Sequence, residues 1–191
     1  RILAREQQAQ SAGACACLGP VELVSRVKSF RRFWKVHGAP LEAEVELDLP
    51  AVDYQTRGLW FEAPPGPGGP EGLSWAGAHA AMHALLHALP LFVSADRADL
   101  DAACVDEHGA PPMDRARLML FDAQRGGLGL CDEAFPRAFA LLREARRLVE
   151  ACPCQEGCPN CIVDARCREY NRLLSKRGAL AWLRGLEGED P

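Results

Sequence analysis

The sequence predicts an α/β (α+β) fold, in which a mixed sheet packs with helices and a small cysteine-rich module follows. Three observations lead to this prediction. Apolar and acidic residues alternate over 41–49, alanine and leucine dominate 73–93, and five of the nine cysteines fall within the sixteen residues 152–167. The chain has 191 residues and is 48% hydrophobic, which is enough for one sizeable core with a satellite module.

The composition divides the chain into three parts. Residues 1–20 are rich in Ala, Gln, Ser and Gly, and we expect them to form a linker or a frayed segment. Residues 21–150 would form the α/β body, and residues 151–186 the cysteine-rich module with its terminal helix. Because the sequence begins with Arg1 rather than Met, we expect it to be a piece of a longer protein.

Strands are predicted where apolar residues alternate or cluster between turn signals. The period of two over 41–49 indicates a half-buried strand, which Pro50 ends. Short extended pieces are also indicated by the apolar residues Val21, Leu23, Val27 and Phe30. Residues 58–61 and the apolar run 118–121 are predicted as two further short strands. The segment 64–72 consists of Pro, Gly and one Glu, so we expect a loop there.

Three helices are expected. The first spans 73–93 and ends near Pro90, and the last spans about 172–184. The second spans about 133–150, with Asp132 as its N-cap and apolar side chains at helical spacing on one face.

Charge and hydropathy exclude several classes of protein. A net charge of −4 argues against a domain that binds nucleic acid by charge alone, although local basic patches remain possible. No run of about 18 apolar residues occurs, so we expect no membrane partner. The charged N-terminal residues do not fit a secretory signal, and an intracellular location is expected.

The cysteine cluster is the strongest chemical signal. Tetrahedral zinc takes four thiolates, whereas this stretch offers five cysteines. Cys158 and Cys161 form the familiar pair with two residues between them, and Cys154 and Cys167 can complete the set. Cys152 is then a spare, or a substitute for Cys154. Four thiolates leave no position for water, so we expect a structural Zn²⁺ ion without metal catalysis.

A second group of possible ligands is His79, His83 and His87, which are spaced four residues apart on one face of the first helix. Two of them could bind a metal. We favour a packed helix whose histidines bond to neighbouring polar groups, with Asp96 and Asp99 as natural partners.

Two further features have a structural and a functional interpretation. Cys15 and Cys17 are expected to be free thiols, and a second metal site is the alternative.

Asp122 with the glycines of 126–129 could approach a phosphate, but the sequence lacks the Gly-x4-Gly-Lys-Ser/Thr pattern of a nucleotide loop. We favour a close-packed turn between a strand and a helix.

Basic and aromatic residues suggest contacts with nucleic acid, because Arg and Lys pair with phosphates while aromatic rings stack on bases. A solvated surface is the alternative. The candidates form one group near residue 30 and another around the cysteine cluster: Arg31, Arg32 and Trp34; Arg143, Arg146, Arg147, Arg168 and Lys176.

Four stretches, in order along the chain, carry a resemblance to a known family: 47–50 with 54–56 and 59–61; 79–85 with 89–90 and 96–100; 121–122 with 126–130; and 152–161 with Cys167, Asn171 and Lys176. Together they resemble the MrfA-type zinc-binding domain at the C-terminal end of superfamily 2 DNA helicases, which include mitomycin-repair helicases and fungal and plant RecQ4-like relatives. Phe121 stands where the family usually has Tyr. The resemblance covers roughly residues 20–186.

The resemblance implies an accessory domain of an ATP-dependent 3′–5′ DNA helicase in DNA repair. ATP and Mg²⁺ would bind only to upstream RecA-like domains of the same polypeptide, and DNA would be a partner. The chain alone is then not expected to be an enzyme. Residues 167–171 look most like the eukaryotic branch, which implies a nuclear location, whereas a bacterial protein would be cytoplasmic. The alternatives are a zinc-dependent enzyme and a zinc-stapled protein-interaction module without direct DNA contact.

Overall fold

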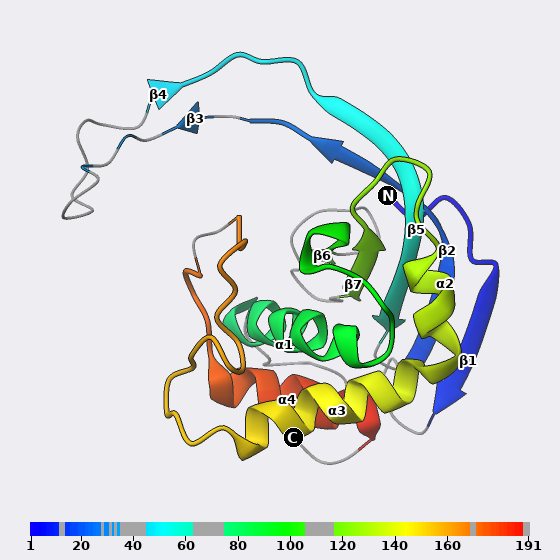
Figure 1. Ribbon diagram of the computed structural model, residues 1–191, viewed down its shortest axis with the longest axis vertical. Helices are drawn as coiled ribbons and strands as arrows, with labels where there is room; N and C mark the ends of the chain where they lie inside the picture. Colours follow the sequence, from blue (N-terminus) through cyan, green and yellow to red (C-terminus); the bar gives the residue numbers. More distant parts are fainter. Residues whose placement is uncertain are drawn as a thin grey trace.

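A computed structural model describes residues 1–11, 14–27, 29–30, 32, 34, 45–62, 75–105, 117–168 and 171–188. Its centre is a five-stranded sheet in which every neighbouring pair is antiparallel. A separate two-stranded ribbon extends away from this sheet as an arm (Figure 1). In spatial order the sheet strands are β1 (Gln7–Ser11), β2 (Ala14–Ser25), β5 (Val52–Glu62), β7 (Arg117–Asp122) and β6 (Leu100–Val105); the arm pairs β3 (Ser29–Phe30) with β4 (Val45–Glu46).

The two faces of the sheet bury different side chains, because successive residues of a strand point to opposite sides. Leu18 pairs with Leu59 on the face that packs against the helices. Cys17 pairs with Trp60 on the other face, where a smaller cluster forms with neighbouring strands. All four side chains are almost completely buried.

The helices cover one face of the sheet, and α1 is central among them (Figure 1). Eleven of the fourteen residues of α1 are buried, many of them alanines that allow close packing. None of the helices in the described ranges combines the length and the apolar character that a membrane crossing needs. The helical elements are α1 (Trp75–Ala88), η1 (Leu89–Leu91), η2 (Arg97–Asp99), α2 (Leu130–Ala134), η3 (Phe135–Arg137), α3 (Ala138–Ala151) and α4 (Lys176–Glu187).

Helices α1 and α4 contact each other through glycine. A Cβ atom added to Gly77 would lie 2.8 Å from the carbonyl carbon and oxygen of Gly178. The N–H of Ser175, which caps α4, also donates to the carbonyl of Ala76. The C-terminal helix therefore packs directly against the backbone of α1.

The predicted fold class is confirmed, with two corrections. The sheet is antiparallel rather than mixed among the described residues. Residues 1–20 are not a frayed segment as far as they are described, because they contain β1 and the first half of β2. The signal was weak because Ala14 and Ala16 are small, although both are buried beneath the helices.

Individual elements agree with the sequence to different degrees. The strand at 118–121 and the helices at 73–93 and 172–184 are confirmed, with shifted ends. The helix expected over 133–150 is split into α2, η3 and α3, and Asp132 lies inside α2 instead of capping it. Strand β6 was not predicted. The loop at 64–72 and residues 41–44 lie outside the described residues. Within the described part of the alternating stretch, 45–49, Val45–Glu46 forms a strand.

Candidate metal centre

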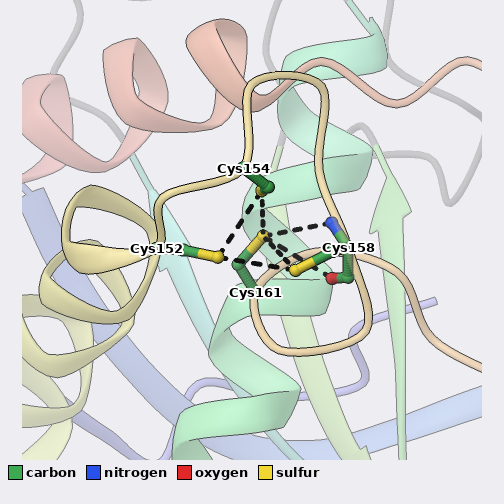
Figure 2. A group of neighbouring side chains, drawn as sticks. All are labelled: Cys152, Cys154, Cys158 and Cys161. Carbon is green, nitrogen blue, oxygen red and sulfur yellow. Dashed lines mark hydrogen bonds between the residues drawn. The ribbon is translucent and has the colours of Figure 1, made fainter.

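Four cysteine sulfurs converge in the loop that follows α3. Figure 2 shows Cys152, Cys154, Cys158 and Cys161 pointing toward a common centre, with all four sulfurs within 4.8 Å of one another. The Sγ–Sγ distances are 3.5 Å for Cys152–Cys154, 3.4 Å for Cys152–Cys158, 3.5 Å for Cys154–Cys161 and 3.9 Å for Cys158–Cys161. Tetrahedral zinc with Zn–S bonds of about 2.3 Å requires sulfurs about 3.8 Å apart, so this set fits the ion.

A tight turn brings Cys158 and Cys161 together. The Cys158 carbonyl accepts hydrogen bonds from the N–H groups of Cys161, Ile162 and Val163 at 3.0–3.1 Å. The Cys158 N–H donates to Cys161 Sγ at 3.3 Å. Gly157 has a φ of +118°, and a Cβ there would lie 2.5 Å from the Ile162 side chain, so only glycine suits this position.

Lys176 connects the cysteine loop to the last helix. Its Nζ donates to the carbonyls of Cys152 at 2.6 Å and Cys154 at 2.7 Å. The ammonium therefore lies beside a group of sulfurs that becomes anionic on metal binding. Lys176 is also one of the residues predicted to contact nucleic acid, and its ammonium group is hydrogen-bonded to the loop.

The protonation of the sulfurs differs between positions. The pKa of Cys152 is lowered to about 7, first by a hydrogen bond from the Cys154 backbone and then by neighbouring thiols. Burial raises the pKa of Cys161 to about 12. Because zinc binds thiolates, metal binding has to displace the Cys161 proton, and affinity rises with pH.

Cys167 lies apart from these four cysteines. Its Sγ is 3.3 Å from Nε2 of His79 on α1, and the two form a group with His83. The structure thus brings Cys152 to the position for which sequence analysis preferred Cys167. The reason is that Cys167 follows a further turn, in which its N–H donates to the Asp164 carbonyl, and this turn places it against α1.

Asp164 organises that turn. Its buried carboxylate accepts hydrogen bonds from the Arg97 guanidinium and, at 2.8 Å, from the Arg166 N–H. The Asn171 side chain bonds to both the N–H and the carbonyl of Asp164 at 2.9 and 2.8 Å. Burial alone would raise the pKa of Asp164, but the Arg166 N–H and Arg97 outweigh it and lower the pKa.

The histidines of α1 have different partners from those expected. Asp96 and Asp99 cap η2, with Asp96 accepting from the Ala98 N–H at 2.8 Å. His83 Nδ1 lies 2.7 Å from the Ile162 carbonyl. Burial is the main cause that lowers the pKa of His83 to about 4, so its imidazole is neutral at physiological pH.

The glycine turn after β7 binds a carboxylate of the chain itself. Oδ2 of the buried Asp122 accepts from the N–H groups of Leu128, Gly129 and Leu130 at 2.6, 2.7 and 3.2 Å, and Oδ1 accepts from Cys131 at 3.0 Å. These donors are therefore not available to a phosphate. The interpretation as a close-packed turn between a strand and a helix agrees with this geometry.

The basic candidates are spread over the surface. Arg32 and the 54%-exposed Trp34 follow β3, whereas Arg143 and Arg147 are exposed on α3. Figure 1 places the arm and α3 on opposite sides of the body. Arg31 lies outside the described residues.

Ion pairs engage several of these side chains. Arg146 contacts the largely buried Glu187 at 3.1 Å, and Arg147 contacts Glu144 at 2.6 Å. Arg168 pairs with Asp101 at 2.7 Å and lines a cavity of about 820 Å³, together with Arg166 and Trp75.

The sequence of the chain is similar to those of known proteins. Residues 81–162 match a family described as the MrfA Zn-binding domain. The chain is 33% identical over 147 residues to the ATP-dependent helicase HRQ1 of Saccharomyces cerevisiae and 31% identical over 162 residues to hrq1 of Schizosaccharomyces pombe. Each match covers 71% of this chain but 14% of the relative, so the chain spans about one seventh of the proteins it resembles.

A solved structure shares the fold. The DUF1998 helicase MrfA, in a crystal structure described as bound to DNA, superimposes with a TM-score of 0.67. The match covers 97% of this chain and 24% of that one, at 22% sequence identity. The likeness therefore extends beyond residues 81–162 to nearly the whole chain.

Proposed function

We propose that this chain, whose residues 81–162 match the MrfA Zn-binding domain, is an accessory domain of an ATP-dependent 3′–5′ DNA helicase that acts in DNA repair. The proposal assigns ATP and Mg²⁺ to upstream RecA-like domains of the same polypeptide. It is supported by the similarity of the chain to two proteins described as ATP-dependent helicases. For a eukaryotic DNA helicase the proposed location is the nucleus.

The observation that carries the proposal is the spacing of the sulfurs of Cys152, Cys154, Cys158 and Cys161, which suits one tetrahedral Zn²⁺ ion. Zinc supplies a strong cross-link to a loop with few apolar side chains of its own. Four thiolates would complete the coordination sphere, so the role proposed for this ion is structural. The loop begins directly at the end of α3, and it bonds to Lys176 at the start of α4, so it connects the two helices.

Replacing one ligand tests this assignment. Cys158→Ser should remove one equivalent of zinc, measured by atomic absorption after dialysis, and lower the melting temperature. Cys15→Ser is the matched control, because Cys15 lies on β2, remote from the loop in sequence, and contacts Cys17. Retention of the full zinc content by Cys158→Ser would refute the four-cysteine site.

We also propose that exposed basic and aromatic side chains contact DNA. The set is Arg32, Trp34, Arg143, Arg147 and Arg168, which face solvent at least in part. Arg31 remains a proposal from sequence alone. Arg146 and Lys176 also remain proposals from sequence, but their side chains are less exposed than those of Arg147 and Arg168. Arginines pair with phosphates, and an exposed indole stacks on unpaired bases.

The salt dependence of binding tests these contacts. Replacing Arg143, Arg147 and Arg168 together by Gln should weaken binding to single-stranded and duplex DNA, and should flatten the plot of log affinity against log salt by about 0.7–0.9 per lost phosphate contact. Arg125→Gln, which removes an exposed arginine outside the set, is the control and should leave the slope unchanged. If the wild-type chain binds no DNA even at low salt, the alternative of a protein-interaction module is favoured.

A further inference from the structure

A second group of metal-ligating side chains lies outside the four-cysteine loop. His79 and His83 are one turn apart on α1, and Cys167 approaches them from the segment after the cysteine loop. Their ligand atoms lie within 4.8 Å of one another. The two imidazole rings are 4.5 Å apart and nearly perpendicular, at 66°, so they meet edge to face.

The distances suit a shared ion. Zinc bonds of about 2.3 Å to sulfur and about 2.05 Å to nitrogen place tetrahedral N and S ligands roughly 3.6 Å apart. The observed separation of His79 Nε2 and Cys167 Sγ is 3.3 Å, so an ion could enter with a small movement of the side chains. Two imidazoles and a thiolate are donors that Zn²⁺ and similar transition metals prefer over Mg²⁺ or Ca²⁺.

A backbone carbonyl orients one of the ligands. The Ile162 oxygen, 2.7 Å from His83 Nδ1, can only accept a hydrogen bond, so Nδ1 carries the proton. Nε2 of His83 then keeps its lone pair for a metal. Histidine ligands in metal sites commonly donate their other N–H to a carbonyl in this way, which fixes the ring.

The surroundings differ from those of the four-cysteine loop. His79 and His83 are each 2% exposed, whereas Cys167 is half-buried. All three line the cavity of about 820 Å³ described above. Three protein ligands beside a cavity leave a fourth coordination position that faces open space, whereas the four cysteines would enclose their ion. Asp164, which also lines the cavity, is already bonded to Arg97 and to the Arg166 N–H.

We propose that His79, His83 and Cys167 bind a second divalent transition-metal ion of the Zn²⁺ class, with its fourth coordination position open to the cavity. The ion would join α1 to the segment after the cysteine loop. The inference rests on this side-chain group alone and does not depend on the helicase assignment.

Metal content of the whole 191-residue chain tests the proposal. After removal of metal and reloading with Zn²⁺ or Co²⁺, the wild type should take up two equivalents. Cys167→Ser and, separately, His79→Gln should each take up one. His87→Gln is the matched control, since His87 lies on the same helix face outside the group, and it should keep both. Cobalt spectra should show that Cys167→Ser loses the charge-transfer absorption of one thiolate among five.

The outcomes separate this proposal from the one above. Wild-type uptake of a single equivalent that Cys158→Ser abolishes would overturn the second site and leave the first intact. Unchanged metal content in Cys158→Ser would overturn the first site instead. Cys167→Asp keeps a ligand at this position, so it should retain the second cobalt ion with a weaker charge-transfer band. Loss of the ion from His79→Gln but not from Cys167→Ser would also contradict the proposed ligand set.

Discussion

The substitution Gly77→Ala tests the contact between α1 and α4. The added methyl would lie 2.8 Å from the Gly178 carbonyl group and 2.9 Å from its Cα atom, well inside van der Waals contact. These obstacles are backbone atoms and cannot rotate away, so the two helices have to separate. Trp182 and Ala179, which are buried on α4, would then lose packing.

The expected loss follows from two opposing effects. Overpacking against an unyielding neighbour costs roughly 3 kcal/mol, at the upper end of the usual range. Alanine is a better helix former than glycine by about 1 kcal/mol, so the net loss is roughly 2 kcal/mol. For a chain of this size such a loss lowers the melting temperature by about 4–8 °C.

Gly185→Ala is the matched control. Gly185 lies in α4, and an added Cβ would have no neighbour within 4 Å, so only the helix-propensity effect remains. We expect this variant to gain up to about 1 kcal/mol. Urea unfolding followed by tryptophan fluorescence measures both variants, because Trp182 is 3% exposed at the helix contact. A Gly77→Ala chain as stable as the wild type would show that the helices are not in the described backbone contact.

Three further perturbations test the metal centre and the turn. Lys176→Met should lower the free energy of unfolding by roughly 2 kcal/mol, because two charge-assisted hydrogen bonds are lost, and should speed zinc transfer to a coloured chelator. Arg177→Met, in the same turn, is the control and should change neither the stability nor the rate of zinc transfer. Asp122→Asn should lower the free energy of unfolding, measured with urea, by roughly 3 kcal/mol, because four N–H donors lose a charged acceptor. Asp132→Asn, at a partly exposed ion pair, is the control and should lower it by under about 1 kcal/mol. Chelation should lower the melting temperature of the wild type and have less effect on Cys158→Ser; equal effects on both chains would contradict the cysteine site.

Sequence patterns predicted the elements whose apolar residues are large or regularly spaced. The helix at α1 was found because alanine and leucine dominate its sequence, and the buried strand at β7 because leucine, methionine and phenylalanine follow one another there. β2 was only partly found, because its first half is built from alanine, cysteine and glycine, which carry little strand signal. Such small residues are buried by the helices that pack over them, so their burial cannot be predicted from the strand sequence.

The ligands of the metal site could likewise be predicted only in part from the sequence. The loop and its zinc chemistry could be predicted from spacing, but spacing could not choose among five cysteines. The structure separates them by a tertiary contact, because Cys167 lies beside His79, which is 88 residues away in the sequence. The hydrogen bonds of Lys176 could not be predicted for a related reason. A lysine near the end of a chain has the composition of a surface cation, and its bonds to two loop carbonyls depend on how α4 is seated.

The packing of α4 against α1 makes the folding of the C-terminal segment dependent on zinc. The antiparallel sheet can form from its own hairpins, but the final helix reaches α1 only after the chain has turned back through the cysteine loop. The ammonium at the start of that helix then bonds to carbonyls whose positions the ligated thiolates would set. A zinc-starved chain should therefore form its sheet first and close its last helix late, at a rate that follows the concentration of free ion.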